Sequence, residues 1–202
     1  MPVPVTQPPS AYDHDVQLRA TLTAVCWIAW VLIWIGAAII YRPDARDPSP
    51  PGETRSRRGL MRLLLAVFLI VALRTYHPGS TTSNAGVGWL GVAVCAAGIG
   101  VATWARVCLG RNWGMPMTVR ARPTLVRSGP YRVVRHPIYS GLLLAAIGSA
   151  LAIGPGWLVV VIGAGGYCLV SMRVEENDMA AAFPEQYPEY AGHTKRLIPF
   201  VY

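Results

Sequence analysis

The sequence predicts an all-α integral membrane protein with about five transmembrane helices. Of its 202 residues, 53% are apolar and only 14% are charged, against about 25% charged residues in an ordinary soluble domain. The charges are concentrated in a few blocks with long charge-free runs between them, which is typical of chains that cross a bilayer. The same composition excludes a wholly disordered chain, because it carries more apolar surface than a solvated chain tolerates.

The first expected span covers residues 21–41. Residues 1–20 contain four prolines and charges of both signs, so we expect a flexible N-terminal segment there. The next 21 residues carry no charge, and as a helix they are long enough to cross roughly 30 Å of hydrocarbon. Trp27, Trp30 and Trp34 recur at helical spacing within this run. They therefore share one helix face, which indicates packing against other helices.

Two further spans are expected before residue 106, which makes residues 21–105 an N-terminal transmembrane region. The second span, 59–76, has an uninterrupted core of only 11 residues, between Arg62 and Arg74. Both arginines are near its ends, where long side chains reach the membrane surface. The third span, residues 87–105, is rich in glycine and alanine, which favours close helix packing.

A helical hairpin is expected after these spans. Residues 137–172 form a run of 36 residues without a charge, and Gly154-Pro155-Gly156 divides it near its middle. Proline and glycine end helices and form tight turns. The sequence therefore predicts spans at about 138–153 and 157–172, antiparallel and joined by a short turn.

The distribution of basic residues predicts the orientation. With five helices, 16 of the 18 basic residues lie on the side of the C-terminal tail, and cytoplasmic loops carry the excess of arginine and lysine. We therefore expect a cytoplasmic C-terminus and an N-terminus outside. The net charge of +8 indicates contacts with anionic membrane lipids, not nucleic acid. The four scattered cysteines are expected to be small buried side chains, without a metal site or a disulfide framework.

The hairpin brings two polar segments together at the cytoplasmic face. Neighbouring antiparallel helices lie about 8–10 Å apart, so the residues before the first span of the hairpin face those after the second. The side chains expected to meet are Arg135, His136, Tyr139, Arg173, Glu175 and Glu176. Carboxylates and guanidiniums together suit a zwitterionic ligand that carries hydroxyl groups.

The ordered motifs of residues 106–200 resemble the isoprenylcysteine carboxyl methyltransferase family of membrane enzymes. They are Leu125-Val-Arg-Ser-Gly-Pro-Tyr131, Arg135-His-Pro-Ile-Tyr-Ser-Gly141, the hydrophobic hairpin, Arg173-Val-Glu-Glu176, Tyr187-Pro-Glu-Tyr190 and Ile198-Pro199. The resemblance implies that residues 106–202 form a methyltransferase region with S-adenosylmethionine as the methyl donor. It also implies a lipophilic small-molecule acceptor that arrives from the bilayer.

The resemblance assigns roles to individual residues. Those expected at the donor are Leu125, Val126, Gly129, Tyr131, Arg135, His136, Tyr139, Gly141, Glu175 and Glu176. Arg173 is the candidate catalytic residue, which holds an acceptor carboxylate. The expected reaction is carboxyl O-methylation of an isoprenylcysteine-like or other small lipid. The residue usage, rich in arginine, alanine and glycine, suggests a bacterial source and hence the inner membrane.

Other functions remain open from the sequence. A phospholipid or amino-lipid N-methyltransferase would share the donor site, and an amine or thiol acceptor would need a base such as Glu175, Glu176 or His136. Some membrane sterol reductases have a comparable C-terminal half that binds NADPH. A lipid-binding protein without enzymatic activity is the remaining class. The sequence carries no signal for an oligomeric state.

Overall fold

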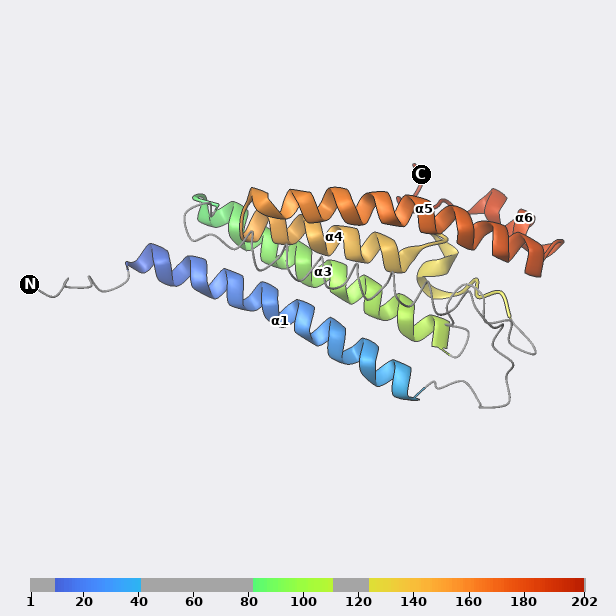
Figure 1. Cartoon of the computed structure of the whole chain (residues 1–202), viewed down its shortest axis with the longest axis horizontal. Helices are drawn as coiled ribbons and strands as arrows, with labels where there is room; N and C mark the ends of the chain where they lie inside the picture. The colour runs from blue at the N-terminus through green and yellow to red at the C-terminus, as the bar shows by residue number, and fades with distance from the viewer. Residues whose placement is uncertain (1–9, 41–81, 111–123, 202) are drawn as a thin grey trace, which may run out of the picture.

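The computed structural model describes residues 10–40, 82–110 and 124–201, and most of these residues are helical (Figure 1). The helices are α1 (Ala11–Ile40), α3 (Ala85–Leu109), α4 (Pro137–Ala152), α5 (Leu158–Ala182) and α6 (Gln186–His193), with short 3-10 helices η2 (Gly129–Arg132) and η3 (Pro155–Trp157). The predicted all-α class is confirmed. The expected second span, residues 59–76, lies outside the described residues.

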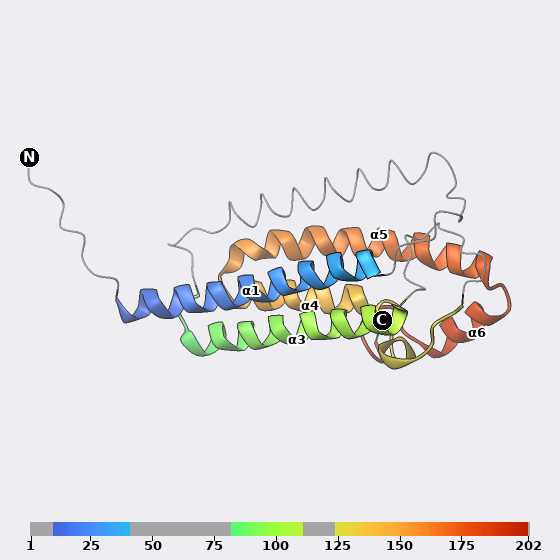
Figure 2. The same ribbon diagram turned by 90° about the horizontal axis from the view of Figure 1, so that it is seen from below.

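The long helices run side by side, as two perpendicular views show (Figures 1 and 2). α1, α3 and the helix that starts at Pro155 are long and apolar enough to cross a membrane, and α4 is a shorter apolar helix. These spans confirm an integral membrane protein. η2 lies beside the C-terminal end of α3, and α6 lies at the same end of the bundle.

α1 begins ten residues earlier than the sequence analysis expects. Its start is capped at Ser10, whose backbone N–H and hydroxyl both donate to the Asp13 carboxylate. In the next turns Asp15 forms an ion pair with Arg19 at 2.9 Å. The described part of the segment expected to be flexible is therefore helical, because polar contacts continue the helix beyond the apolar run.

Arg19 is buried in the bundle, although the sequence suggests a charge at the outer membrane surface. Its side chain is 0% exposed, and its guanidinium donates to the carbonyls of Thr82 and Ala152. It thereby ties α1 to the start of α3 and the end of α4. The ion pair with Asp15 compensates the burial of its charge.

α3 and α4 pack backbone against backbone through glycines. A Cβ atom added at Gly98 would lie 2.5 Å from the backbone nitrogen of Ala145, and one added at Gly148 would lie 2.3 Å from that of Cys95. Small residues allow membrane helices to approach this closely. The expected close packing of the third span is confirmed, and it gives α4, which carries the candidate site at its N-terminus, a fixed position.

The tryptophans of α1 pack against this pair of helices. The Nε1 of Trp27 donates to the Ser149 hydroxyl at 3.0 Å, and its ring stacks on Trp157 with centroids 6.0 Å apart. Trp30 also packs against the buried core around Cys95. The packing role predicted for this face of α1 is confirmed.

The hairpin has the predicted turn. α4 ends at Ala152, and Gly154 has φ of 153°, a conformation that favours glycine. η3 then leads directly into α5. α5 continues past Met172 to Ala182, so the carboxylates that follow the apolar run lie on a rigid helix beside the start of α4.

Candidate functional site

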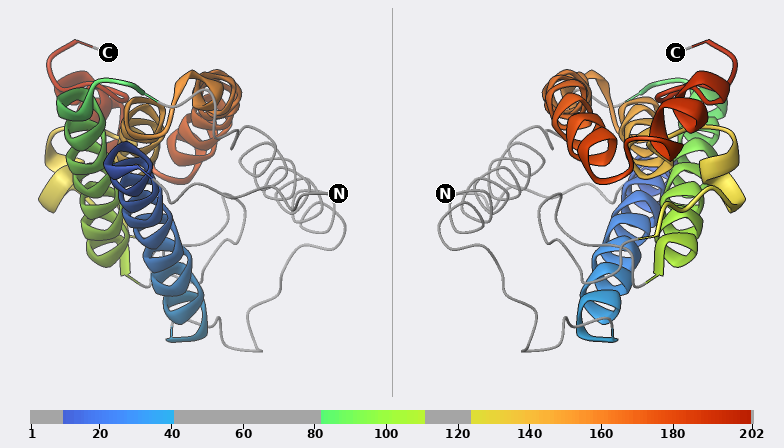
Figure 3. Two further views of the ribbon diagram at one scale, coloured as in Figure 1. Left: turned by 90° about the vertical axis from the view of Figure 1, so that its left-hand side faces the viewer. Right: turned by 90° about the vertical axis from the view of Figure 1, so that its right-hand side faces the viewer.

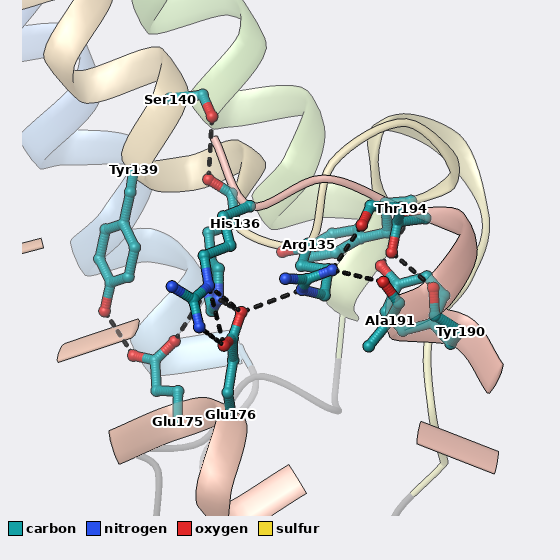
Figure 4. A network of polar contacts seen from close by, with 11 residues as sticks. Arg135, His136, Tyr139, Ser140, Glu175, Glu176, Tyr190, Ala191 and Thr194 are labelled. Atoms are coloured by element: carbon teal, nitrogen blue, oxygen red, sulfur yellow. Dashed lines mark hydrogen bonds and ion pairs between the residues drawn. The ribbon is translucent and has the colours of Figure 1, made fainter. Parts of the chain in front are cut away.

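Two segments of the hairpin and the C-terminal segment meet at one end of the bundle (Figure 4). Arg135 and His136 precede α4, Tyr139 lies in its first turn, and Glu175 and Glu176 lie on α5. The rigid hairpin therefore brings together side chains that are about 40 residues apart in sequence.

Glu176 is the centre of the cluster. Its carboxylate accepts a hydrogen bond from Arg135 Nε at 2.9 Å and from Arg196 Nη2 at 2.7 Å. His136 Nε2 lies 3.4 Å from the same carboxylate. The side chain is 13% exposed, so these cations compensate a charge that is largely withdrawn from water.

His136 stands between the two glutamates. Its Nδ1 lies 3.4 Å from Glu175 Oε2, and its Nε2 lies 3.4 Å from Glu176 Oε1. Burial opposes the charged ring, but the hydrogen bonds to both carboxylates outweigh it, so the pKa of His136 is raised above its ordinary value of 6.5. A carboxylate at each ring nitrogen favours the imidazolium form, in which both nitrogens are donors.

Glu175 is the more accessible carboxylate of the pair. Its side chain is 27% exposed, while the His136 side chain is buried. Tyr139 donates its hydroxyl to Glu175, and its ring stacks with that of His136 at a centroid distance of 5.7 Å. One edge of this carboxylate is therefore held in place while the group remains in reach of a ligand.

The C-terminal segment closes one side of the cluster through backbone contacts. The backbone N–H groups of Arg135 and His136 donate to the carbonyls of Lys195 and Arg196 at 2.7 and 3.0 Å. The Arg135 Nη1 donates to the carbonyls of Ala191 and Thr194. The chain after α6 is thus fixed against the start of α4, which places Arg196 on Glu176.

η2 and α6 form the neighbouring wall. Tyr190 donates its hydroxyl to the Tyr131 carbonyl at 2.7 Å, and Tyr187 packs edge-on against Tyr190. Burial raises the pKa of Tyr190 to about 12, so this phenol stays a neutral donor. Gly129 at the start of η2 has φ of 60°, which favours glycine.

The remaining predicted site residues have different surroundings. Leu125 and Val126 are half-buried in the segment before η2. Arg173 is exposed on α5 and makes no hydrogen bond or ion pair with another described residue. Gly141 faces α3, where an added Cβ would lie 2.6 Å from the Gly98 carbonyl oxygen. Its contact is therefore with a neighbouring helix.

Arg196 is the contributor that sequence reasoning missed. It makes three hydrogen bonds to the Glu176 carboxylate. The only signal in the sequence is its place between α6 and the Ile198-Pro199 motif. The contact of Arg196 with Glu176 could not be predicted from sequence spacing, because the position of Arg196 depends on how the chain turns after α6.

The cluster is built to bind charges of both signs. It offers the exposed edge of the Glu175 carboxylate beside the guanidinium of Arg196, which is 33% exposed. Within the described residues, no group of three histidine, cysteine, aspartate or glutamate side chains has the arrangement of a metal site. The arrangement therefore favours an organic ligand with both an acidic and a basic group.

Known proteins are similar to this chain in sequence and in fold. The family model described as "Phospholipid methyltransferase" matches residues 87–186, which include η2, the hairpin and both glutamates. The structure is similar to that of the eukaryotic intramembrane Ras methyltransferase ICMT, isoprenylcysteine carboxyl methyltransferase. The TM-score is 0.56 at 19% identity, over 89% of this chain and 68% of that one.

Two relatives show how much of the chain is shared. A methanethiol S-methyltransferase of Mycobacterium tuberculosis is 40% identical over 70 residues, 35% of this chain and 28% of the relative. The cobalt-zinc-cadmium resistance protein CzcN of Cupriavidus metallidurans is 32% identical over 150 residues, 72% of this chain and 65% of the relative. The chain thus spans about a quarter of the first relative and slightly less than two thirds of the second. On these matches, residues 87–186 are similar to the phospholipid methyltransferase family of membrane enzymes, and the fold is similar to that of the isoprenylcysteine carboxyl methyltransferase.

Proposed function

We propose that the chain is a membrane methyltransferase that takes its methyl group from S-adenosylmethionine and transfers it to a lipophilic acceptor. The observation that carries the proposal is the placement of His136 between Glu175 and Glu176 at the end of the bundle. The match of the family model over residues 87–186 supports methyl transfer as the reaction.

The side chains of the cluster fit the charged groups of this donor. S-adenosylmethionine supplies a methyl group that its positive sulfur already activates. Glu175 offers a carboxylate to the ribose hydroxyls or the ammonium group, and Arg196 offers a guanidinium to the carboxylate. Glu176 and His136 hold these two residues in position. Leu125, Val126, Gly129 and Tyr131, before and within η2, form part of the proposed wall for the adenine ring.

A carboxylate is the acceptor that this cluster suits best. His136 faces a carboxylate with each ring nitrogen, and Glu176 is engaged by two arginines, so neither is placed to take a proton. An ionised carboxylate needs no base, and its reaction depends on orientation and exclusion of water. We propose the exposed guanidinium of Arg173 as the group that holds its charge.

A thiol acceptor is the second candidate. It is favoured by the 40% identity to a methanethiol S-methyltransferase over 70 residues. A thiol needs a base, because the thiolate is the nucleophile. Glu175 is then the proposed base, since its carboxylate is more exposed than that of Glu176.

Binding of S-adenosylhomocysteine tests the donor site. Calorimetry on the full chain in detergent compares the wild type with Glu175→Gln, which keeps the shape of the side chain and removes its charge. We expect about tenfold weaker binding from the loss of one charge-assisted hydrogen bond. Glu185→Gln, an exposed residue before α6, is the matched control. Unchanged binding in both Glu175→Gln and His136→Ala would contradict the site.

The product of the reaction tests the acceptor. Membrane extracts are incubated with the chain and a donor that carries a labelled methyl group, and the labelled lipid is then treated with base. A methyl ester releases labelled methanol, whereas a methylated thiol or amine keeps its label. Release of the label supports a carboxylate acceptor, and retention supports a thiol or an amine acceptor.

A further inference from the structure

A second recess lies between η2 and α6, beside the cluster described above. Its volume is about 300 Å³, and its lining residues are Arg127, Arg132, Glu189, Tyr190, His193 and Thr194. The proposed methyl transfer uses none of its charged side chains. Figure 3 shows η2 on the side of the bundle where α3 lies, with α5 on the other side.

Arg127 is held in place at the edge of this recess. Its Nη2 donates to the Gln186 carbonyl at 2.9 Å, and its guanidinium lies over the ring of Tyr190 at 5.8 Å. Its Nη1 is 3.8 Å from the exposed carboxylate of Glu189. A guanidinium that is already ordered loses little conformational freedom when it binds an anion.

The floor of the recess is rigid and its rim is cationic. Tyr190 and Thr194 are buried, and their hydroxyls donate to the backbone carbonyls of Tyr131 and Tyr190. Arg132 and His193 are exposed at the rim. The floor groups are therefore engaged within the protein, while the basic side chains at the rim are accessible to a ligand.

The charge of the lining favours an anion. Two guanidiniums and one imidazole face a single carboxylate, that of Glu189, so the recess attracts negative charge. Arginine pairs well with the planar array of oxygens on a phosphate. A phosphate diester with a small headgroup is consistent with the volume of the recess.

The position of the recess points to a lipid as the source of that phosphate. It lies at the end of helices that are long enough to cross a membrane. Apolar side chains are exposed in the adjoining segments. Val133 follows Arg132, and Phe200 in the C-terminal segment is 91% exposed. Basic residues next to exposed apolar side chains are typical of a surface that contacts anionic headgroups and the upper acyl chains.

We propose that the recess between η2 and α6 binds the phosphate of an anionic membrane lipid, separately from the methyl-donor site. Arg127 and Arg132 contact the phosphate oxygens, and the headgroup rests against Tyr190. The bound lipid holds α6 at the membrane surface. Because α6 leads into the segment that carries Arg196, the lipid also stabilises the wall of the neighbouring cluster.

Soluble short-chain phosphatidylglycerol is the probe for this site. Its binding to the full chain in a neutral detergent is measured by the shift in thermal unfolding and by native mass spectrometry. Short-chain phosphatidylcholine and inorganic phosphate are measured in parallel. We expect phosphatidylglycerol to bind most tightly, because choline carries a positive charge and inorganic phosphate lacks the apolar contacts.

Arg132→Gln tests the contact without disturbing the fold, because this side chain is exposed. We expect about tenfold weaker binding of phosphatidylglycerol, the effect of one lost charge-assisted contact, and the same for Arg127→Gln. Lys195→Gln removes an exposed cation outside the recess and is the matched control, with unchanged binding expected. The affinity for S-adenosylhomocysteine is measured in Arg132→Gln and Lys195→Gln and is expected to stay at the wild-type value.

Three results would overturn the proposal. If Arg132→Gln and Lys195→Gln weaken phosphatidylglycerol binding equally, the lipid is attracted by diffuse surface charge. If inorganic phosphate binds as tightly as the lipid, the recess is a site for a free anion. Loss of S-adenosylhomocysteine binding in Arg132→Gln would make the recess part of the donor site. A chain that binds the lipid but no S-adenosylhomocysteine would instead refute the methyl-donor site and leave this proposal supported.

Discussion

The two carboxylates that face the ring nitrogens of His136 favour the charged form of the ring. Its pKa in the folded chain is raised above 6.5, so the folded state binds the proton more tightly than the unfolded chain. The resulting stabilisation is fully present below about pH 6.5 and is lost as the pH rises through the pKa of the folded state. The contribution of the cluster to the stability of the folded state therefore declines as the pH rises above the pKa of His136.

Thermal unfolding in detergent across this pH range tests the prediction. We expect the midpoint of the wild type to fall, relative to that of His136→Gln, as the pH rises above 6.5. His14→Gln removes an exposed histidine of α1 and should follow the wild type. Parallel curves for the wild type and His136→Gln would show that the pKa of His136 is not raised in the folded chain.

The Glu176 carboxylate compensates the charges of two arginines, so its loss should lower the free energy of unfolding. Glu176→Gln leaves Arg135 largely buried without a carboxylate, and breaking such a pair costs about 3 kcal/mol. Arg196→Gln should cost less, about 1 kcal/mol, because this arginine is more exposed. The free energy of unfolding in detergent measures both. A cost for Glu176→Gln no larger than that for the exposed Glu185→Gln would show that the ion pairs contribute nothing.

At the scale of elements, the contact of α3 with α4 sets where the cluster lies. Gly98→Ala places a Cβ 2.5 Å from the Gly141 carbonyl oxygen, where backbone must move, and overpacking costs about 1–3 kcal/mol. Gly100→Ala, on the same helix, meets nothing within 4 Å and should be neutral or stabilising by up to about 1 kcal/mol. Thermal unfolding of both variants measures the difference. Equal midpoints would show that the two helices are not in backbone contact.

At the scale of the whole molecule, the basic residues predict a cytoplasmic C-terminus. Arginine and lysine are concentrated on the side of the tail, with 16 of the 18 there if five spans are present. A C-terminal green fluorescent protein fusion in bacteria should therefore fluoresce, and a C-terminal alkaline phosphatase fusion should be inactive. The opposite pair of results would place the candidate site outside the cell and remove its access to a cytoplasmic donor.

The sequence alone was sufficient to predict the hairpin and the contact between its two ends. A charge-free run interrupted by Gly154-Pro155-Gly156 requires two antiparallel helices, and their ends then have to meet. Local periodicity and turn chemistry determine this arrangement. For that reason the contact of His136 with Glu175 and Glu176 was predicted correctly. The second span stays a prediction, because it lies outside the described residues.

Only the tertiary structure decided which residues complete the site and the packing around it. Arg196 reaches Glu176 because the chain turns back after α6. Arg19 is buried because the carbonyls of Thr82, before α3, and Ala152, at the end of α4, accept hydrogen bonds from it. Gly141 faces α3 because two glycine-bearing helix faces lie in register. Each of these contacts joins segments far apart along the chain, and their geometry depends on helix positions that no local pattern of residues specifies.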